Sequence, residues 1–286
     1  MTTTEAQAYC TTVTQQSGSN FYYSFLFLPP QRRQAMHAVY AFCKEIDSVV
    51  DDAPPGSNPQ EALGKWRAEL DAAYRGHPTY PVTICLVEHA HQLGIPKEYC
   101  DSLIDGVEMD LTTSRYATFD DLAVYCYRVA SVVGLICLKV FGTRSPRASE
   151  YAINLGMAFQ LTNVLRDLGS DADRGRIYLP LEDLGRFKYS EDELLKKTHS
   201  PAFMELMQRE CARARQFYEK AHEVFVSLSP EDQRTLTVAE IMRSVYARIL
   251  SRIEDSGYRV FGPRISMPPA YRLALAAGVW LRSRFL

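Results

Sequence analysis

Apolar residues recur at helical spacing along almost the whole chain, and this periodicity restricts the fold more than any other feature. Side chains three and four residues apart lie on one face of an α-helix, so the repeat gives each helix one face to bury. No segment shows the run of alternating apolar and polar residues that is typical of strands. The sequence predicts helices over residues 31–51, 60–75, 80–93, 97–111, 119–141, 147–170, 200–228, 231–256 and 268–283.

Short segments rich in proline and glycine separate these predicted helices. DAPPGSNP (52–59), RGHPTYP (75–81) and GTRSP (142–146) contain the residues that commonly end helices. GRIYLPLEDLGRF (175–187) is the main predicted non-helical insert. Because no long linker or low-complexity tract divides the chain, we expect one all-α domain over residues 1–286, a single bundle of about ten helices.

The charge and cysteine patterns exclude several classes of protein. A net charge of −2 lacks the basic excess of a general nucleic-acid binder. The seven cysteines form no CxxC pair and no zinc-like spacing, so we expect free thiols in a reducing compartment. Residues 1–16 lack the basic start and apolar run of a secretory signal, and the least polar run (129–142) contains Lys139 and is too short to span a bilayer. We therefore expect a cytoplasmic protein without a nucleic-acid partner.

Carboxylates gather at the C-terminal ends of two predicted apolar helices. KEIDSVVDD (44–52) follows the first helix, although the helix dipole disfavours negative charge at that end. NVLRDLGSDADRGR (163–176) repeats the arrangement. Asp47 and Asp51 are four residues apart, and so are Asp167 and Asp171, which places each pair on one helix face. A cation is one explanation for this charge; simple solvation of helix ends is the other.

Two facing aspartate pairs suit Mg²⁺ and a diphosphate. Mg²⁺ takes one or two carboxylates, keeps several waters and completes its shell with phosphate oxygens. Arg166, Arg174 and Arg176 could add bidentate contacts to the same phosphates. Other catalytic patterns are missing: His89 and His91 fall on different helix faces, and no GxSxG, GxGxxG or Walker A loop occurs.

Five sequence blocks, taken in order, resemble the squalene and phytoene synthases, which join two prenyl diphosphates head to head. The resemblance extends from about Ser17 to Arg264. Within the family, FYYSFLFLPP, DGVEMDL and the C-terminal GYRVFGPRIS are most similar to bacterial presqualene diphosphate synthases of hopanoid pathways. The blocks are FYYSFLFLPPQRR (21–33), VYAFCKEIDSVVDD (39–52), DGVEMDL (105–111), YCYRVASVVG (125–134) and FQLTNVLRDLGSDADRGRIYLPLEDL (159–184).

This resemblance implies an isoprenoid-synthase fold, in which one helical bundle surrounds a deep central cavity. It implies Mg²⁺ held by Asp47, Asp51, Asp167 and Asp171. The implied catalytic residues are Tyr125 near the reacting carbons, Arg166 at the diphosphate–metal centre and Tyr178 in a flap over that centre. The implied substrate-binding residues are Phe21, Phe25, Tyr40, Lys44, Gln160, Asn163, Arg176, Tyr246 and Arg264; ordinary core packing is the alternative for the first three.

Four positions depart from the family pattern. Ser48 and Ser170 stand where relatives commonly carry a second acid beside each aspartate pair. Lys44 stands where relatives often have arginine, so the positive charge is kept without the bidentate fork. Ser131 replaces a glycine of the YCxxVAG block. These changes bear on metal affinity and turnover more than on the class of reaction.

The expected reaction converts two farnesyl diphosphates into presqualene diphosphate and diphosphate, feeding squalene and hopanoid synthesis. Mg²⁺ is the expected cofactor, and NADPH is needed only if the enzyme continues to squalene. The alternatives are a squalene or dehydrosqualene synthase, a phytoene synthase that uses the longer geranylgeranyl substrate, and a catalytically inert family member that acts as a partner of lipid-pathway enzymes. Downstream enzymes of the same pathway are further candidate partners.

The C-terminal segment PAYRLALAAGVWLRSRFL (269–286) mixes large apolar residues with three arginines. One interpretation is a closing helix that packs on the bundle. The other is a helix that rests on a membrane surface, with its arginines near anionic lipid heads. The second interpretation adds weak peripheral contact with the inner face of the membrane to the expected cytoplasmic location.

Overall fold

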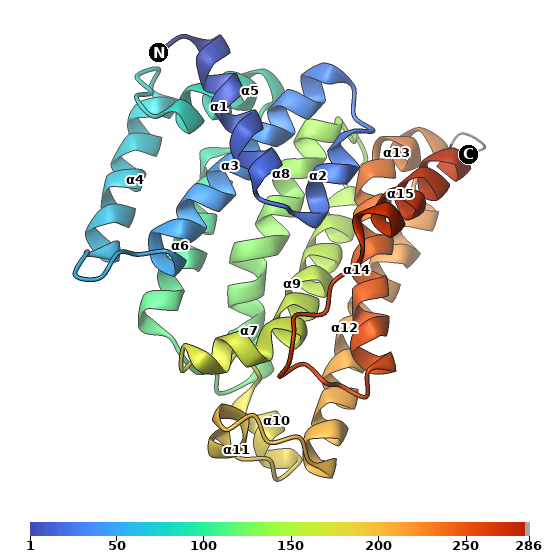
Figure 1. Cartoon of the computed structure of the whole chain (residues 1–286). Helices are drawn as coiled ribbons and strands as arrows, with labels where there is room; N and C mark the ends of the chain where they lie inside the picture. Colours follow the sequence, from blue (N-terminus) through green and yellow to red (C-terminus); the bar gives the residue numbers. More distant parts are fainter. Residues whose placement is uncertain (284–286) are drawn as a thin grey trace.

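A computed structural model describes residues 1–283, and helices make up most of that part of the chain (Figure 1). The elements are α1 (Thr3–Gln16), α2 (Asn20–Phe25), α3 (Pro30–Asp51), α4 (Pro59–Tyr74), α5 (Pro81–Leu93), α6 (Lys97–Thr112), α7 (Phe119–Cys126), the π-helical turn η1 (Tyr127–Ser131), α8 (Val132–Phe141), α9 (Ala148–Asp173), α10 (Leu181–Arg186), α11 (Glu191–Leu195), α12 (Pro201–Ser227), α13 (Pro230–Thr235), α14 (Thr237–Asp255) and α15 (Pro269–Ser283). Within residues 1–283 the only strand-like pairing is an isolated bridge between Arg115 and Ile177. The predicted all-α class is confirmed.

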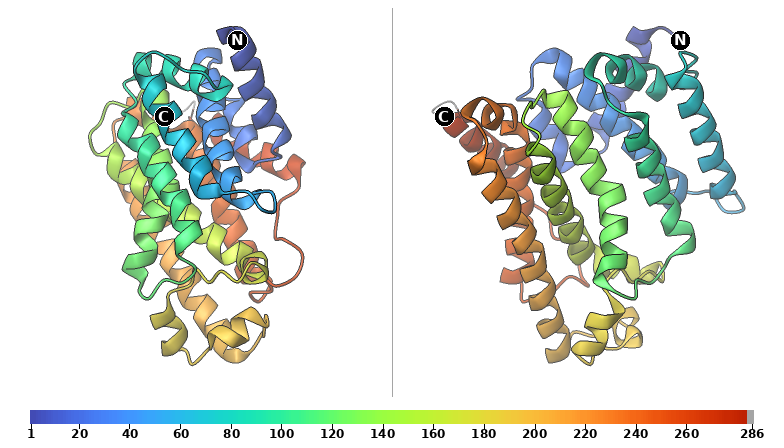
Figure 2. Two further views of the ribbon diagram at one scale, coloured as in Figure 1. Left: turned by 90° about the vertical axis from the view of Figure 1, so that its left-hand side faces the viewer. Right: turned by 180° about the vertical axis from the view of Figure 1, so that it is seen from behind.

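The long helix α9 is the central element of the bundle. It packs against α12, α8, η1 and α14, and Figures 1 and 2 show it enclosed by these elements. Its buried residues recur on several faces, as expected of a helix with neighbours on all sides. The second aspartate pair lies at the C-terminal end of α9, and α3 carries the first pair at its own C-terminal end.

Local signals explain where many helices begin and end. Asn58 caps α4 ahead of a proline at its first position, and Ser200 caps α12 in the same way. Gly94 and Gly142 end α5 and α8 in the left-handed conformation, which glycine adopts without strain. The predicted breaks at 52–59, 75–81 and 142–146 therefore fall between helices, with Pro59 and Pro81 as the first residues of α4 and α5.

The structure contains more helices than the roughly ten predicted. Residues 3–16 form α1, which the sequence analysis missed because this Thr- and Gln-rich helix buries only Ala6, Cys10 and Thr14. The predicted helix 231–256 is divided at Leu236 into α13 and α14, and the 175–187 insert contains the short helix α10. Such divisions depend on local hydrogen bonds that leave the apolar period almost unchanged.

The continuous helical run Phe119–Phe141 is 23 residues long and apolar enough to cross a membrane by length and composition. This helical run is longer than the apolar segment 129–142 considered in the sequence analysis, because α7, η1 and α8 join without a break. More than half of its most apolar window is buried in the bundle, where α8 packs on α9, α6 and α3. That burial is typical of a core helix.

Candidate active site

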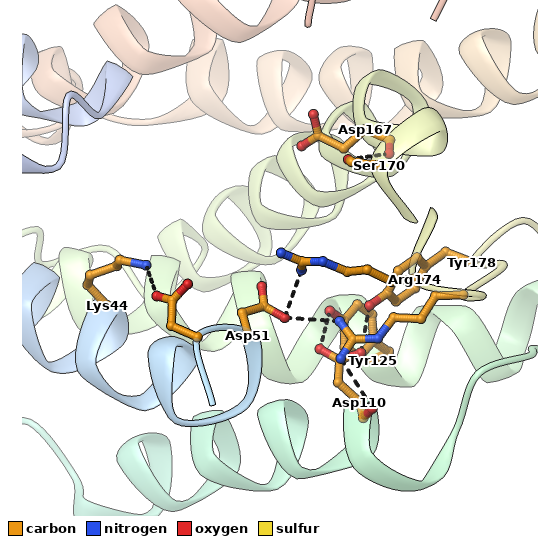
Figure 3. Close-up of polar contacts among 10 residues, drawn as sticks. Lys44, Asp51, Asp110, Tyr125, Asp167, Ser170, Arg174 and Tyr178 are labelled. Carbon is orange, nitrogen blue, oxygen red and sulfur yellow. Dashed lines mark hydrogen bonds and ion pairs between the residues drawn. The ribbon is translucent and has the colours of Figure 1, made fainter. Parts of the chain in front are cut away.

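The two aspartate pairs are brought to one region of the bundle, and each is partly neutralised by arginines. Asp51 Oδ1 lies 3.1 Å from Arg174 Nη1 and 3.0 Å from Arg176 Nη1. Figure 3 shows these contacts between α3 and the segment after α9. The segment that follows α9 therefore folds back onto the first aspartate pair.

The second pair has its own arginine partners. Asp167 accepts hydrogen bonds from Arg166 Nε and Nη2 at 2.9 and 2.5 Å, and from Arg264 Nε and Nη2 at 2.8 Å each. Arg264 comes from the extended segment between α14 and α15, so the C-terminal part of the chain reaches this site. Burial raises the pKa of Asp167, but the hydrogen bonds from both arginines outweigh it and hold that pKa below its usual value.

Asp47 and Asp171 lose their protons less readily than Asp167 does. Burial, together with the neighbouring Asp51, raises the pKa of Asp47 to about 6, although the side chain stays accessible from the cleft. Burial and the nearby Asp167 raise the pKa of Asp171 to about 7. Asp110 also raises both values, which places it close to both pairs. A cation bound between these carboxylates would relieve their mutual repulsion.

Asp110, at the end of α6, is a site residue that sequence reasoning missed. Its carboxylate accepts hydrogen bonds from Tyr178 Oη at 2.6 Å and Tyr125 Oη at 3.1 Å (Figure 3). Its carbonyl oxygen accepts a 3.5 Å bond from Arg176 Nη2. Burial, followed by the negative charge of Asp110, raises the pKa of Tyr178 and of Tyr125 well above the usual value. Asp110 lies in the DGVEMDL block, so that block was the available signal.

Tyr116 completes an aromatic cluster around Asp110. Its ring centroid lies 5.7 Å from that of Tyr125 and 5.8 Å from that of Tyr178, and the latter two centroids are 5.2 Å apart. Tyr116 is almost fully buried, and its hydroxyl has no hydrogen-bond partner among the described residues. The three rings form a wall beside the aspartates, with quadrupoles that can interact with positive charge.

A polar cleft and an apolar cavity adjoin at this site. The polar cleft is lined by Lys44, Asp47, Asp110 and Tyr125, among others. The apolar cavity contains about 950 Å³ of empty space, part of it open to solvent. The walls of the cleft and the cavity share Tyr40, Cys43, Val129 and Gln160. A molecule with a charged head and an apolar chain can therefore extend from one into the other.

The structure places the remaining predicted residues as follows. Phe21, Phe25 and Tyr40 line the apolar cavity, and Tyr246 stacks on Phe21 with 5.4 Å between ring centroids. Lys44 lines the polar cleft, where its nearest acid is Asp52 at 3.4 Å.

Gln160 and Asn163 line the apolar cavity, and Asn163 Nδ2 donates a 3.2 Å hydrogen bond to Gln160 Oε1. Ser170 donates to the carbonyl of Asp167 at 2.8 Å, so its hydroxyl is engaged with its own helix.

The oxygen ligands at this site fit Mg²⁺ that is bound together with a phosphate group. Within residues 1–283 no three acidic, histidine or cysteine side chains converge on a preformed metal site. Each aspartate pair offers two carboxylates, and Asn163 Oδ1 is a buried acceptor without a hydrogen-bond partner among the described residues. Mg²⁺ commonly binds through one or two carboxylates and substrate phosphates, so separate pairs are suitable.

A helical bundle with paired aspartates beside an apolar cavity defines an enzyme class that handles prenyl diphosphates. The family model for squalene/phytoene synthase matches residues 14–271, and the chain belongs to that family. It is thus a head-to-head prenyltransferase with the isoprenoid-synthase fold, and its substrates are prenyl diphosphates.

Curated relatives and solved structures agree with this assignment. A phytoene synthase of Arthrospira platensis is 38% identical, over 100% of this chain and 96% of the relative. A 15-cis-phytoene synthase of Synechocystis is 36% identical, over 99% of this chain and 86% of the relative. A dehydrosqualene synthase structure superposes with a TM-score of 0.87 at 27% identity, over 99% and 98% of the two chains. A squalene synthase structure from Alicyclobacillus acidocaldarius gives a TM-score of 0.81 at 26% identity, over 89% and 95%.

Proposed function

We propose that this chain, acting as one catalytic domain over residues 1–286, condenses two farnesyl diphosphates into presqualene diphosphate. The observation that carries the proposal is the shared wall between the polar cleft and the apolar cavity, which suits a diphosphate head and a prenyl chain. The C1–O bond of one substrate breaks and diphosphate leaves. The double bond of the second substrate attacks the allylic cation, and loss of one proton closes the cyclopropane ring.

The arginines and aspartates are proposed to hold the diphosphates. Bound Mg²⁺ would neutralise the leaving diphosphate, with Asp47, Asp51, Asp167 and Asp171 as its ligands. Arg174 and Arg176 already face Asp51, and Arg166 and Arg264 face Asp167, so the four guanidinium groups are positioned to turn towards phosphate oxygens. Lys44, Gln160 and Asn163 complete the polar wall.

Aromatic side chains are proposed to protect the cation. Phe21, Phe25 and Tyr40 line the apolar cavity and Tyr246 stacks on Phe21, so these rings would surround the prenyl chain. Tyr125, in the wall of the polar cleft, and the neighbouring Tyr178 would lie beside the reacting carbons. A cavity that excludes water prevents capture of the cation as an alcohol, and ring faces stabilise positive charge. Asp110 fixes the hydroxyl ends of Tyr125 and Tyr178, so their orientation is set before substrate binds.

Phytoene formation from two geranylgeranyl diphosphates is the second candidate. The 38% and 36% identical relatives carry that name, whereas the blocks FYYSFLFLPP, DGVEMDL and GYRVFGPRIS favour presqualene diphosphate. Purified protein should be incubated with Mg²⁺ and each substrate separately, with and without NADPH, and the lipid extract analysed by mass spectrometry. Presqualene diphosphate with farnesyl diphosphate, unchanged by NADPH, is expected. Phytoene as the main product would indicate a phytoene synthase, and squalene formed only with NADPH would indicate a squalene synthase. Either result would contradict the proposal.

An inert family member is the remaining alternative, motivated by Ser48 and Ser170. The Asp47→Asn variant separates it from an enzyme. Turnover should fall at least about a hundredfold while the melting temperature of the metal-free protein stays the same or rises, because the carboxylate repels Asp51 and its pKa is already raised. A lowered melting temperature with lost helicity would make Asp47 structural, and wild-type protein without metal-dependent binding of a diphosphate analogue in calorimetry would be inert.

A further inference from the structure

The segment between α9 and α10 carries three site residues without the support of a helix. Arg174, Arg176 and Tyr178 lie within five positions, after α9 ends and before α10 begins. Gly175 has a φ of 71°, the left-handed conformation that glycine adopts without strain, and the chain turns there. Side chains that must meet a ligand in a defined geometry need a backbone that is held in place, and a loop supplies this less readily than a helix does.

Three hydrogen bonds fix the two peptide groups that flank Arg176. The Gly175 carbonyl accepts a 2.6 Å bond from Arg115 Nη1, and the Arg176 N–H donates to the Asp171 carbonyl at 2.9 Å. The next N–H along the chain donates to the Ser114 carbonyl at 3.0 Å. Because a peptide group is planar, these bonds set the direction in which the Arg176 side chain leaves the backbone. One of the three partners is a side chain, Arg115, which comes from the loop between α6 and α7.

Arg115 is itself held in place by further contacts. Its Nη1 also donates to the Ser114 carbonyl at 2.7 Å, and its Nε donates to Glu191 Oε2 of α11 at 2.5 Å. Arg115 and Ile177 form the isolated parallel bridge, so the two backbones lie side by side. The acid that pairs with the Arg115 guanidinium is therefore outside the two aspartate pairs, whereas the arginines at the site contact Asp51 or Asp167.

We propose that Arg115 is a positioning residue of the reaction, which holds the Gly175 carbonyl so that Arg176 faces Asp51 and the diphosphate that binds there. Arg176 Nη1 lies 3.0 Å from Asp51 Oδ1, and only 16% of the Arg176 side chain is exposed, so the side chain has little room to move. Its reach towards a phosphate oxygen then depends on the position of its backbone, and a misplacement of about 1 Å can cost about a hundredfold in rate. The inference rests on the proposed function, in which Arg176 binds diphosphate. Arg115 acts through Arg176 and does not touch the substrate.

Calorimetric binding of inorganic diphosphate to the full chain in the presence of Mg²⁺ tests the proposal. The Arg115→Met variant should bind diphosphate about 5- to 20-fold more weakly than wild type, and its release of diphosphate from farnesyl diphosphate should slow by about tenfold or more. Its melting temperature should fall only slightly, because the backbone bonds between residues 114–117 and 177–182 remain. Arg144→Met is the matched control. It removes an exposed arginine that lies 3.6 Å from Glu231, and it should bind diphosphate like wild type.

A double-mutant cycle separates positioning from a general loss of structure. If Arg115 acts through Arg176, the variant Arg115→Met, Arg176→Met should bind diphosphate within about twofold of Arg176→Met alone. The combination of Arg115→Met with Arg264→Met, at the other aspartate pair, should instead multiply the two losses of affinity. Multiplied losses in both combinations, or wild-type affinity in Arg115→Met, would overturn the proposal. If Arg115→Met does not fold, Arg115→Lys replaces it in both cycles, since lysine keeps the charge opposite Glu191 but loses the guanidinium fork.

Two results distinguish this inference from the proposed function. Unchanged diphosphate affinity in Arg176→Met would contradict the proposed role of Arg176 and, with it, the positioning by Arg115. Weakened binding in Arg176→Met together with wild-type binding in Arg115→Met would leave the role of Arg176 intact and contradict the positioning by Arg115 alone.

Discussion

At the scale of single residues, Asp110 joins parts of the site that are distant in sequence. It accepts hydrogen bonds from Tyr125, fifteen residues later, and from Tyr178, which follows α9. A hydrogen bond to a charged group contributes about 1.5–3 kcal/mol, so one carboxylate holds two catalytic candidates with useful strength. The positions of Tyr125 and Tyr178 therefore depend on Asp110, an acid that belongs to neither aspartate pair.

The Asp110→Asn variant should reduce turnover by about 10- to 100-fold, because the amide can satisfy the two hydroxyls only weakly. Steady-state rates of Asp110→Asn, Tyr125→Phe and the double variant measure the coupling. If Asp110 acts through Tyr125, the double variant should lose little more than the worse single variant. Asp105→Asn, on the same helix and paired with Arg67, is the control and should retain turnover. Fully additive losses would mean that Asp110 acts independently of Tyr125.

At the scale of elements, a close contact between α9 and η1 sets the position of Tyr125. A Cβ added to Gly156 would lie 2.5 Å from Ser131 Cα and 2.7 Å from Ser131 N. Ser131 is fully buried and donates to the Ile153 carbonyl at 2.9 Å. The serine that replaces a family glycine is therefore accommodated by a glycine on the opposing helix. π-helical turns are frequent near functional sites, and η1 begins two residues after Tyr125.

The Gly156→Ala variant should separate α9 from η1 and lower stability by about 1–3 kcal/mol, because the new methyl group meets backbone atoms that cannot rotate away. Denaturant unfolding measures this change. Gly64→Ala on α4, where nothing lies within 4 Å of the added atom, should be neutral or slightly stabilising. Equal stability of Gly156→Ala and wild type would show that the two helices are free to shift.

A buried ionic cluster attaches α10, which follows the Tyr178 segment, to α12. Arg213 lies 2.8 Å from Asp183 and 2.6 Å from Glu210, and all three side chains are nearly inaccessible. The two acids share Arg213, and Arg186 Nη1 adds a longer 3.7 Å contact to Asp183. Burial raises the pKa of Glu210 to about 7. Attraction to Arg213 lowers this pKa and repulsion from Asp183 raises it, and burial is the largest of the three effects.

This raised pKa predicts a stability change with pH. The folded protein retains a proton on Glu210 that the unfolded chain loses near pH 4.5, so the group stabilises the fold below that pH and loses this contribution as pH rises to about 7. The Glu210→Gln variant should lack this pH dependence. The free energy of unfolding of the variant minus that of wild type should therefore increase by about 1–3 kcal/mol between pH 5 and pH 8. Parallel stability curves for the two proteins between pH 5 and 8 would contradict the prediction. Arg213→Met should be destabilising throughout, because it removes the arginine partner of buried Glu210 and the shorter of the two arginine contacts of Asp183.

At the scale of the whole molecule, ligand binding should link α3, α9 and the C-terminal segment. The first aspartate pair is bonded to the segment after α9, and the second to Arg264 before α15. Mg²⁺ would bind the aspartates and the diphosphate, and the diphosphate would bind Mg²⁺ and the arginines. Either ligand alone would lack the contacts that the other supplies. The folded state should therefore be stabilised cooperatively.

Adding Mg²⁺ with inorganic diphosphate should raise the melting temperature more than the sum of the two separate effects. At a ligand concentration one hundred times the dissociation constant the gain is about 2.7 kcal/mol. Thermal unfolding of wild type and of the Asp47→Asn, Asp171→Asn variant measures it, and the variant should lose most of the increase. Additive effects of the two ligands in wild type would indicate separate binding sites.

The sequence by itself determined the all-α class, the positions of most long helices and the two aspartate pairs. These features depend on local spacing: a period of 3.6 residues decides which side chains share a helix face, and four residues bring two carboxylates together. Phe21, Phe25 and Tyr40 were identified from sequence blocks, and the structure places them in the cavity wall.

Only the tertiary structure decided which distant residues meet. The hydrogen bonds of Asp110, the pairing of Arg264 with Asp167 and the fit of Gly156 against Ser131 join segments separated by up to 97 residues. The direction of the apolar face of α15 likewise depends on what α14 and α2 cover. Local periodicity tells a helix which face is apolar, but the packing of the other helices decides whether that face is buried or open.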